Sequence, residues 1–249
     1  MNPVHQVFEK QQPFIFFHTH VIDRQVLDDA VAAGKSLEVD LSIAEDGTLY
    51  VGHPLSHYTS LGLPPPNNLP LDVVLGEMKD AGLFLVLDCK DVRVLPKAQE
   101  IIEEYGSENS LFHSWSDALV LNPYLEEWDV VQPNWAAEEL PHEEIIKLRE
   151  ATHVPMVLTC HRGLTAQRLK TDGDAIVEQI FEAVGGDAEA ISFSLPHDQS
   201  VPLSAMQKLI EHHILPSIHI DRMPPEARPS VYLGATDNLE LASDPKDFR

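Results

Sequence analysis

Short apolar runs alternate with amphipathic stretches along most of the chain. Apolar runs that lack a polar face are typical of strands buried on both sides, as in parallel sheets. The runs predict strands over residues 14–17, 36–43, 49–52, 83–88, 110–114, 129–132, 156–160, 190–195 and 215–220. The amphipathic stretches predict helices over residues 23–34, 71–81, 96–106, 141–150, 174–184 and 203–213. Asp23 as an N-cap and Gly34 just past the last turn mark the ends of the first helix.

This alternation of strands and helices favours a single (β/α)8 TIM barrel over residues 1–249. A doubly wound sheet is less favoured, because no glycine-rich phosphate turn follows the first strand. There are nine strand candidates, so one of them either extends a hairpin or is not a strand. Asp46-Gly47, between runs 36–43 and 49–52, is a typical hairpin signal. No internal repeat or interior linker divides the chain.

The composition is strongly acidic. The 249 residues include 17 Lys or Arg and 40 Asp or Glu, which gives a net charge of −23. This charge argues against a nucleic-acid partner and against an anionic membrane surface, because both need basic side chains. It suits a protein that concentrates divalent cations in an acidic cleft, and a saline habitat would also account for it.

Other compartment signals are weak. Cys89 and Cys160 lie inside apolar runs, so we expect buried thiols and no disulfide. No stretch reaches the roughly 18 apolar residues that a membrane helix needs. The N-terminus also lacks a signal-peptide pattern, so the expected location is cytoplasmic. The oligomeric state is left open.

Carboxylates gather where the predicted strands end, which in a barrel is the active-site face. Glu38 and Asp40 are two residues apart and therefore share one face of their strand. Asp88 ends a later strand. Three carboxylates that converge in a barrel mouth need a cation, and an all-oxygen donor set suits one Mg²⁺ or Ca²⁺ ion.

Two histidines and a lysine accompany these carboxylates. His18 and His53 each end a predicted strand, and Lys90 lies two residues after Asp88. Histidines beside a metal can pass protons near neutral pH, one as a base and one as an acid. The ammonium group of Lys90 would suit a phosphate oxygen. Each residue alone has an ordinary structural explanation, so the prediction depends on the ordered set.

This ordered set resembles the glycerophosphodiester phosphodiesterase superfamily of phospholipase-C-like phosphodiesterases. The resemblance is carried by His18, Glu38-Val39-Asp40, Asp46-Gly47, Val51-Gly52-His53 and Leu87-Asp88-Cys89-Lys90. Their spacing is most similar to that of the branch containing sphingomyelinase D and the menorin-like proteins. The likeness covers roughly residues 14 to 90; beyond them only the strand–helix alternation is similar.

The resemblance implies a role for each matching residue. Glu38, Asp40 and Asp88 would bind the divalent ion, His18 and His53 would be the catalytic pair, and Lys90 would contact phosphate. The implied activity is hydrolysis of a glycerophosphodiester-like or phospholipid-like phosphodiester, which would place the protein in lipid metabolism.

Several positions depart from the family pattern. The usual His-Arg-Gly is His18-Thr19-His20, so its phosphate-binding arginine is missing. The usual Glu-Asn-Thr is absent, the usual His-Asp is His53-Pro54, and Asp88 replaces the common Glu. These departures preserve the metal ligands but put a glycerophosphodiester substrate in doubt. His161-Arg162-Gly163 repeats the missing tripeptide downstream, either by chance or because Arg162 reaches the phosphate from a later strand.

Two other functions remain open. His18-Thr19-His20 is also an H-x-H motif like that of amidohydrolase-like barrels, in which Lys90, His113, His161 and Asp221 could supply further ligands. That alternative gives no role to Glu38, Asp40 or His53. The other alternative is a non-catalytic barrel with a binding role, which the complete set of site residues disfavours.

Residues 57–71 follow His53 and contain three consecutive prolines, Pro64 to Pro66. We expect a loop that these prolines stiffen in an extended form at the rim of the site. Its apolar residues Tyr58, Leu61 and Leu63 predict a wall that favours a leaving group larger or more apolar than glycerol, although an ordinary surface connection would look the same.

Overall fold

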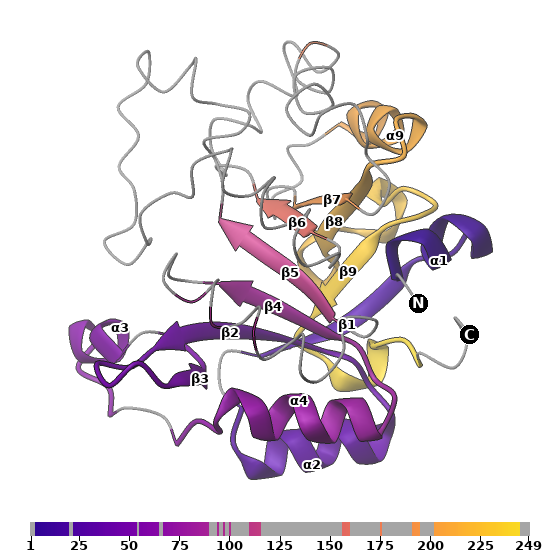
Figure 1. Ribbon diagram of the computed structural model, residues 1–249. Helices are drawn as coiled ribbons and strands as arrows, with labels where there is room; N and C mark the ends of the chain where they lie inside the picture. The colour runs from indigo at the N-terminus through magenta and orange to yellow at the C-terminus, as the bar shows by residue number, and fades with distance from the viewer. Residues whose placement is uncertain are drawn as a thin grey trace.

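The computed structural model describes residues 3–19, 22–53, 55–64, 67–89, 110–115, 156–159, 191–194 and 202–244, with isolated positions 94, 97, 100 and 175. Nine strands in these ranges form one sheet (Figure 1). They are β1 (Phe14–Thr19), β2 (Leu37–Ile43), β3 (Leu49–Val51), β4 (Leu85–Cys89), β5 (Ser110–Trp115), β6 (Met156–Thr159), β7 (Ile191–Ser194), β8 (Leu215–His219) and β9 (Leu233–Thr236).

Eight of these strands are parallel and close into a ring. The order runs from β1 through β9, β8, β7, β6, β5 and β4 to β2, and β2 pairs again with β1. Following the paired residues once around the ring returns to β1 eight residues from the start. A shear of eight is that of a TIM barrel. The predicted (β/α)8 fold is therefore confirmed.

The remaining strand, β3, is the hairpin extension that the surplus strand candidate predicted. It runs antiparallel to β2, with Leu41 opposite Val51. The turn between the strands is closed by a hydrogen bond from Gly47 N to Ala44 O of 3.0 Å, and Gly47 has a φ of 83°. Asp46 Oδ1 accepts a hydrogen bond from Thr48 N at 2.9 Å.

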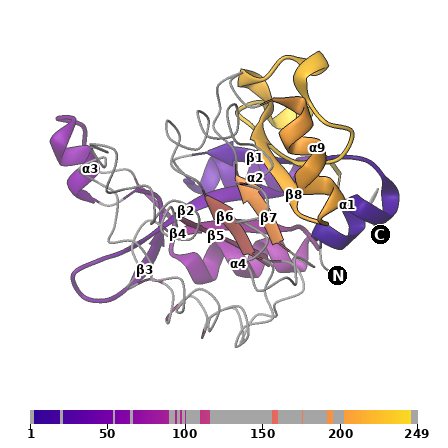
Figure 2. The ribbon, with the colours of Figure 1, turned by 90° about the horizontal axis from the view of Figure 1, so that it is seen from above.

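The described helices lie around and below the ring. They are α1 (Pro3–Lys10), α2 (Arg24–Ala33), α3 (Leu55–Ser60), α4 (Leu71–Asp80) and α9 (Leu203–Glu211), with short 3-10 turns η1 (Ile220–Arg222), η2 (Pro225–Ala227) and η3 (Leu239–Leu241). In Figure 1 the arrowheads of β2, β4 and β5 point to the side where α3 lies, and α1 lies at the opposite side. Figure 2 shows α3 standing out from the barrel on that same side.

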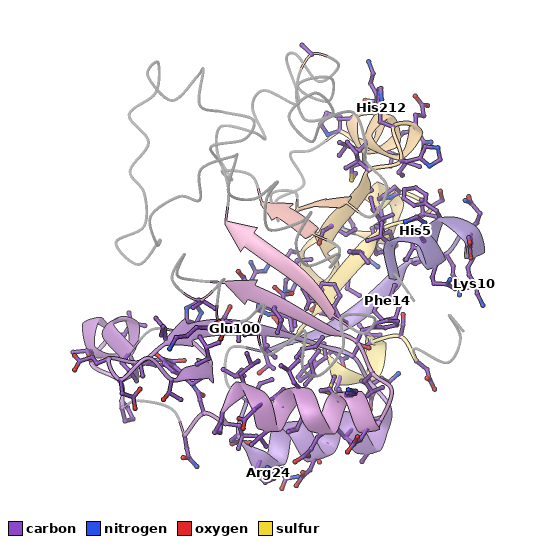
Figure 3. The ribbon with its side chains drawn as sticks, viewed as in Figure 1. His5, Lys10, Phe14, Arg24, Glu100 and His212 are labelled. Atoms are coloured by element: carbon purple, nitrogen blue, oxygen red, sulfur yellow. The ribbon has the colours of Figure 1, made fainter. Side chains whose placement is uncertain are left out.

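Helix α2 begins and ends as the sequence predicts. The Asp23 carboxylate accepts a hydrogen bond from Val26 N at 3.0 Å, and Gly34 adopts the left-handed conformation with a φ of 68°. Arg24, at the start of this helix, forms an ion pair with Glu77 of α4. The two helices therefore pack side by side over the outside of β1, β2 and β4, and Arg24 is labelled on this surface in Figure 3.

The lower half of the barrel interior is apolar and α1 closes it. Phe14 and Phe16 are 1% and 2% exposed and share a cluster with Val4 and Val7 of α1. The rings of Phe14 and Phe84 meet edge to face at 5.4 Å. His5, labelled on α1 in Figure 3, is exposed on the other face of this helix. Burial of the α1 valines closes the barrel at the end opposite the carboxyl ends of its strands.

The sequence missed one barrel strand and two helices. The expected strands lie within one or two residues of the observed ones wherever they are described, but β9, α1 and α3 were not expected. The predicted strand 129–132 and helix 141–150 lie outside the described residues. The helices 96–106 and 174–184 are described only at isolated helical positions. The extent of the domain over residues 1–249 stays a prediction.

The sequence did not predict β9, because this strand is short and contains Gly234 and Ala235, which are poor strand formers. Packing requires the glycine. A Cβ at Gly234 would lie 3.0 Å from Cγ1 of Ile15 and 3.1 Å from Tyr232. The absence of a side chain at Gly234 therefore lets β9 pack closely against β1, and this packing matters more than strand propensity for closing the ring.

Among the described residues, none of the helices has both the length and the apolar character required to cross a lipid bilayer. Cys89 is the last residue of β4, and Cys160 lies outside the described residues.

Candidate active site at the carboxyl ends of the strands

The strand register brings the predicted carboxylates onto the interior face of the barrel. His18 of β1 is paired with Glu38 of β2, and Asp40 of β2 is paired with Asp88 of β4. Paired residues of parallel strands face the same side, and residues two apart share a face. These four side chains therefore continue the inward column that begins with Phe14 in β1. Glu38, Asp40 and Asp88 are 6%, 2% and 4% exposed.

His53 reaches the same region through the β2–β3 hairpin. Gly52 N donates to Asp40 O at 2.7 Å, and the hydroxyl of Ser42 donates to Gly52 O at the same distance. These bonds fix the residue before His53 against β2. The His53 imidazole then lies with Nε2 2.9 Å from Asp40 Oδ2. His53, which was predicted to be catalytic, is thus held by Asp40, which was predicted to bind the metal.

Gly52 is required by its surroundings. Its φ of 126° is one that residues with a side chain rarely adopt. A Cβ at this position would lie 2.0 Å from Nδ2 of Asn68. The Tyr58 ring of α3 lies near the His53 ring, with centroids 6.5 Å apart. Burial raises the pKa of the Tyr58 phenol.

A second histidine–carboxylate pair lies on the neighbouring side of the ring, at β1 and β9. Nδ1 of His18 is 3.0 Å from Oδ1 of Asp237, the first residue after β9. His219, which ends β8, brings Nε2 to 3.3 Å from the same oxygen. The two imidazole rings meet nearly edge to face, with centroids 5.6 Å apart. Asp237 therefore lies between histidines from β1 and β8, the two strands that flank β9.

Asp221 orients the backbone that carries Asp237. Its Oδ2 accepts a hydrogen bond from Asp237 N at 2.7 Å, and its two oxygens accept from the Thr236 hydroxyl at 3.0 and 3.1 Å. Thr236 is fully buried and ends β9. Asp221 is thus a structural acceptor at the end of the last barrel strand.

The environment shifts the protonation of this group. Burial lowers the pKa of the His219 imidazole, with further lowering by the charges of Arg222 and His18, against the opposing effect of Asp237. His219 is therefore held neutral around neutral pH. Burial alone would raise the pKa of Asp237, but the hydrogen bond from His18 and the charges of both histidines lower it below its usual range.

The structure contains a second set of possible metal ligands besides the predicted carboxylates, whose role as ligands stays a prediction. Among the described residues, the group whose donor atoms lie within 4.8 Å of one another is His18, His219 and Asp237. Glu38, Asp40 and Asp88 are buried on adjacent strands but do not form such a group, and one Asp40 oxygen faces His53. Their donor chemistry still fits a hard divalent cation, because all six oxygens are carboxylate oxygens.

Some predicted residues cannot be placed. Lys90, Arg162, His20 and His161 lie outside the described residues. His113 lies on β5 in register with Asp88.

Sequence reasoning missed Asp237 and His219. The signal for both was the one used for His18, namely a polar side chain directly after a short apolar run. His219 was included in the predicted strand 215–220 but was not selected as a site residue. Asp237 was overlooked because the strand before it was not recognised.

The segment after His53 is partly helical. Residues 57–71 were expected to form an extended loop, but α3 covers Leu55–Ser60. Within α3 the Thr59 hydroxyl donates to Leu55 O at 3.0 Å. Tyr58 is buried, whereas Leu61 and Leu63 are 58% and 53% exposed. Only Leu61 and Leu63 of the three are therefore exposed, and the role of this segment as an apolar wall stays a prediction.

The fold and this site together define a TIM barrel with histidines and carboxylates at the carboxyl ends of its strands. No family model matches the chain, and no curated protein matches it by sequence. Solved structures share its fold. A glycerophosphodiester phosphodiesterase from Thermotoga maritima is 13% identical with a TM-score of 0.59, over 92% of this chain and 96% of that one.

Two further structures are similar. A glycerophosphoryl diester phosphodiesterase from Parabacteroides distasonis is 11% identical with a TM-score of 0.57, over 98% of this chain and 92% of that one. An Oleispira antarctica phosphodiesterase in complex with the product sn-glycerol-3-phosphate is 9% identical with a TM-score of 0.54, over 92% and 94%. The resemblance found in the sequence is therefore confirmed for the fold over nearly the whole chain.

Gly52→Ala tests whether the hairpin positions His53. We expect a loss of stability of about 1–3 kcal/mol from the positive φ and a further loss from the contact with Asn68. The displaced hairpin should also separate His53 from Asp40. The measurements are thermal unfolding and the NMR shifts of the His53 ring.

Gly34→Ala is the matched control. Gly34 also has a positive φ, of 68°, but nothing lies within 4 Å of the added Cβ. It should cost stability from backbone strain alone and leave the His53 signals unchanged. Equal effects of both substitutions would show that the Asn68 contact does not position His53.

Proposed function

We propose that this protein is a divalent-metal-dependent hydrolase of phosphodiesters. The observation that carries the proposal is the presence at the barrel mouth of two histidine–carboxylate pairs, His53–Asp40 and His18–Asp237, together with the buried carboxylates Glu38 and Asp88. The fold shared with glycerophosphodiester phosphodiesterase structures supports the same class of reaction.

Glu38, Asp40 and Asp88 would hold one Mg²⁺ or Ca²⁺ ion. Burying three carboxylates on adjacent strands is costly without positive charge, and a divalent cation offsets that cost. When bound, such an ion neutralises phosphate oxygens and stabilises the charge that develops in the transition state. The Asp40 oxygen that faces His53 would couple the position of the histidine to the metal site.

His18 and His53 would be the acid–base pair. Asp237 bonds to Nδ1 of His18, so we assign proton exchange with the substrate to Nε2. Nε2 of His53 contacts Asp40 and Nδ1 of the same ring is buried, so the nitrogen through which His53 exchanges a proton stays open. One histidine takes the proton of the attacking water or substrate hydroxyl, and the other gives a proton to the alcohol that leaves as the P–O bond breaks. Which histidine is the base stays open.

Lys90, and Arg162 with less support, would contact the phosphate. Lys90 follows the last residue of β4, Cys89, in the sequence. Arg162 follows β6 by a few residues. Both assignments stay predictions from the sequence.

The substrate would be a small or lipid-like phosphodiester. One structure of similar fold holds sn-glycerol-3-phosphate as product, which supports a phosphomonoester product here. The exposed side chains Leu61 and Leu63 follow the helix that packs on His53 and favour a leaving group more apolar than glycerol. A cytoplasmic location and the absence of nucleic-acid partners remain expectations from composition.

The acid–base assignment predicts that His18→Ala and His53→Ala each lower Mg²⁺-supported hydrolysis by about 10²- to 10⁴-fold. The assay uses bis(4-nitrophenyl) phosphate and a panel of glycerophosphodiesters and lysophospholipids. His5→Ala, an exposed histidine of α1, should keep full activity. Near-normal turnover of either variant removes that histidine from the mechanism, and no turnover of any phosphodiester by the wild type leaves a binding role.

The metal assignment predicts that Asp40→Asn weakens Mg²⁺ and Ca²⁺ binding by at least about tenfold, because a direct ligand should matter no less than an outer-shell partner. Calorimetry measures this without an activity assay. Asp29→Asn, at an exposed position of α2, changes the net charge equally and should leave the affinity unchanged. Unaltered binding by Asp40→Asn would contradict the assignment.

The apolar surface after α3 predicts a selective effect of Leu61→Ser combined with Leu63→Ser. If each leucine contributes about 1 kcal/mol to binding, KM for a lysophospholipid should rise about 30-fold in the double variant. KM for bis(4-nitrophenyl) phosphate should not change.

Leu241→Ser is the control for this pair. Leu241 is also exposed, at 51%, and lies in η3. Two residues further on, Ser243 N donates to Ile15 O near the start of β1. Equal losses of the double variant on both substrates would mean that the segment supports the fold and does not select the leaving group.

A further inference from the structure

Three side chains at the mouth form a donor set that the proposed phosphodiesterase reaction uses only in part. His18 and Asp237 form one of the two histidine–carboxylate pairs, but His219 has no role in that chemistry. Nδ1 of His18 and Nε2 of His219 lie 3.0 and 3.3 Å from the same oxygen of Asp237. All three donor atoms lie within 4.8 Å of one another.

These separations match the coordination shell of a transition metal. Zinc binds histidine nitrogen at about 2.0–2.1 Å and carboxylate oxygen at about 2.0–2.2 Å, with tetrahedral geometry. Ligand atoms at those distances and tetrahedral angles are about 3.3–3.4 Å apart. The contacts of both nitrogens with Asp237 Oδ1 are already close to that value. The nearly perpendicular rings, with an interplanar angle of 77°, lie as two imidazoles can around one ion rather than stacked.

The surroundings of the group resemble the outer shell of a metal site. The Asp221 carboxylate fixes the backbone of Asp237 at 2.7 Å. The same Asp221 oxygen is 3.8 Å from Nδ1 of His219, the ring nitrogen on the far side from Asp237. Carboxylates behind metal-binding histidines orient the ring and raise its basicity. His219 is 3% exposed, so it is held in place, while Asp237 is 60% exposed at the rim and open to an entering ion.

The donor chemistry separates this group from the carboxylate set. Two imidazoles and one carboxylate suit zinc and its neighbours, whereas the oxygens of Glu38, Asp40 and Asp88 suit Mg²⁺ or Ca²⁺. The strongly negative chain, at −23, attracts cations of either kind to the mouth.

We propose that His18, His219 and Asp237 form an inhibitory site for Zn²⁺, distinct from the site for the activating ion. The inhibition, though not the binding, rests on the proposed function of His18. A zinc ion on Nδ1 takes the place of the proton shared with Asp237 and leaves a neutral ring protonated at Nε2. That ring cannot accept a proton at Nε2, and giving one up would form an imidazolate. His18 is thereby removed from acid–base exchange.

Binding is tested with Co²⁺, whose visible absorption reports tetrahedral coordination with nitrogen donors, in the presence of excess Mg²⁺. The wild type should show the absorption, and Zn²⁺ should displace it. His219→Gln and Asp237→Asn should each lower Co²⁺ affinity by at least about tenfold. Asp237 is exposed, so its variant remains informative if the buried His219 variant unfolds.

Two controls complete the binding test. His5→Gln makes the same change as His219→Gln at an exposed histidine on α1, and Glu38→Gln alters the predicted Mg²⁺ site. Both should keep the Co²⁺ absorption. No absorption in the wild type, or unaltered binding by both site variants, would overturn the proposal.

Inhibition is tested on Mg²⁺-supported hydrolysis of bis(4-nitrophenyl) phosphate. Micromolar Zn²⁺ should inhibit the wild type, and the concentration for half inhibition should rise at least about tenfold in His219→Gln relative to its own rate without zinc. Activation by Zn²⁺, or equal inhibition of both proteins, would overturn the inhibitory role. A protein that binds Co²⁺ through these residues but hydrolyses no phosphodiester with Mg²⁺ would contradict the proposed function and retain the metal site.

Discussion

The closed register of the eight parallel strands is the constraint on which the rest of the structure depends. Once the strands pair with a total shear of eight residues, the side of each strand that faces inward is decided for every residue. A slip of one residue in any pair would turn a whole column outward. The column of β1 passes from Phe14 and Phe16 to His18, and that of β9 passes from Leu233 and Ala235 to Asp237. Apolar layers below and ionisable groups above follow from the same pairing.

This layering explains why the ionisable groups can be buried at all. The apolar lower layers, sealed by Val4 and Val7 of α1, contribute the burial that stabilises the barrel. The upper layer has Asp40 and Asp88 nearly inaccessible, at a free-energy cost that the fold must offset. His53 is held by Asp40 within the local β2–β3 hairpin, whereas His18 is held by Asp237 from the far end of the chain. The ring brings the two pairs together.

Much of the fold could be predicted from the sequence because its signals are local. Asp23 and Gly34 marked α2 through hydrogen bonds and backbone conformation that neighbouring residues determine. The His18, Glu38, Asp40 and Asp88 positions followed from counting along strands. β9 could not be found in this way, since Gly234 is present for its packing against Ile15, which lies 219 residues earlier in the chain. Asp237, the partner of His18, was not predicted either, because its position next to His18 depends on the pairing of β9 with β1.

The two donor sets at the mouth differ in a way that bears on how such a site is regulated. Carboxylates alone bind hard ions and leave imidazoles to carry protons. Here the imidazole of His219 lies beside the His18–Asp237 pair. The geometry that orients a proton-transferring ring then also suits the binding of a softer ion. Asp237 contacts His18, the histidine proposed to transfer protons, and the same Asp237 oxygen faces His219. At this end of the barrel, competition between a proton and a transition metal for one nitrogen is therefore a direct consequence of placing β1, β8 and β9 side by side.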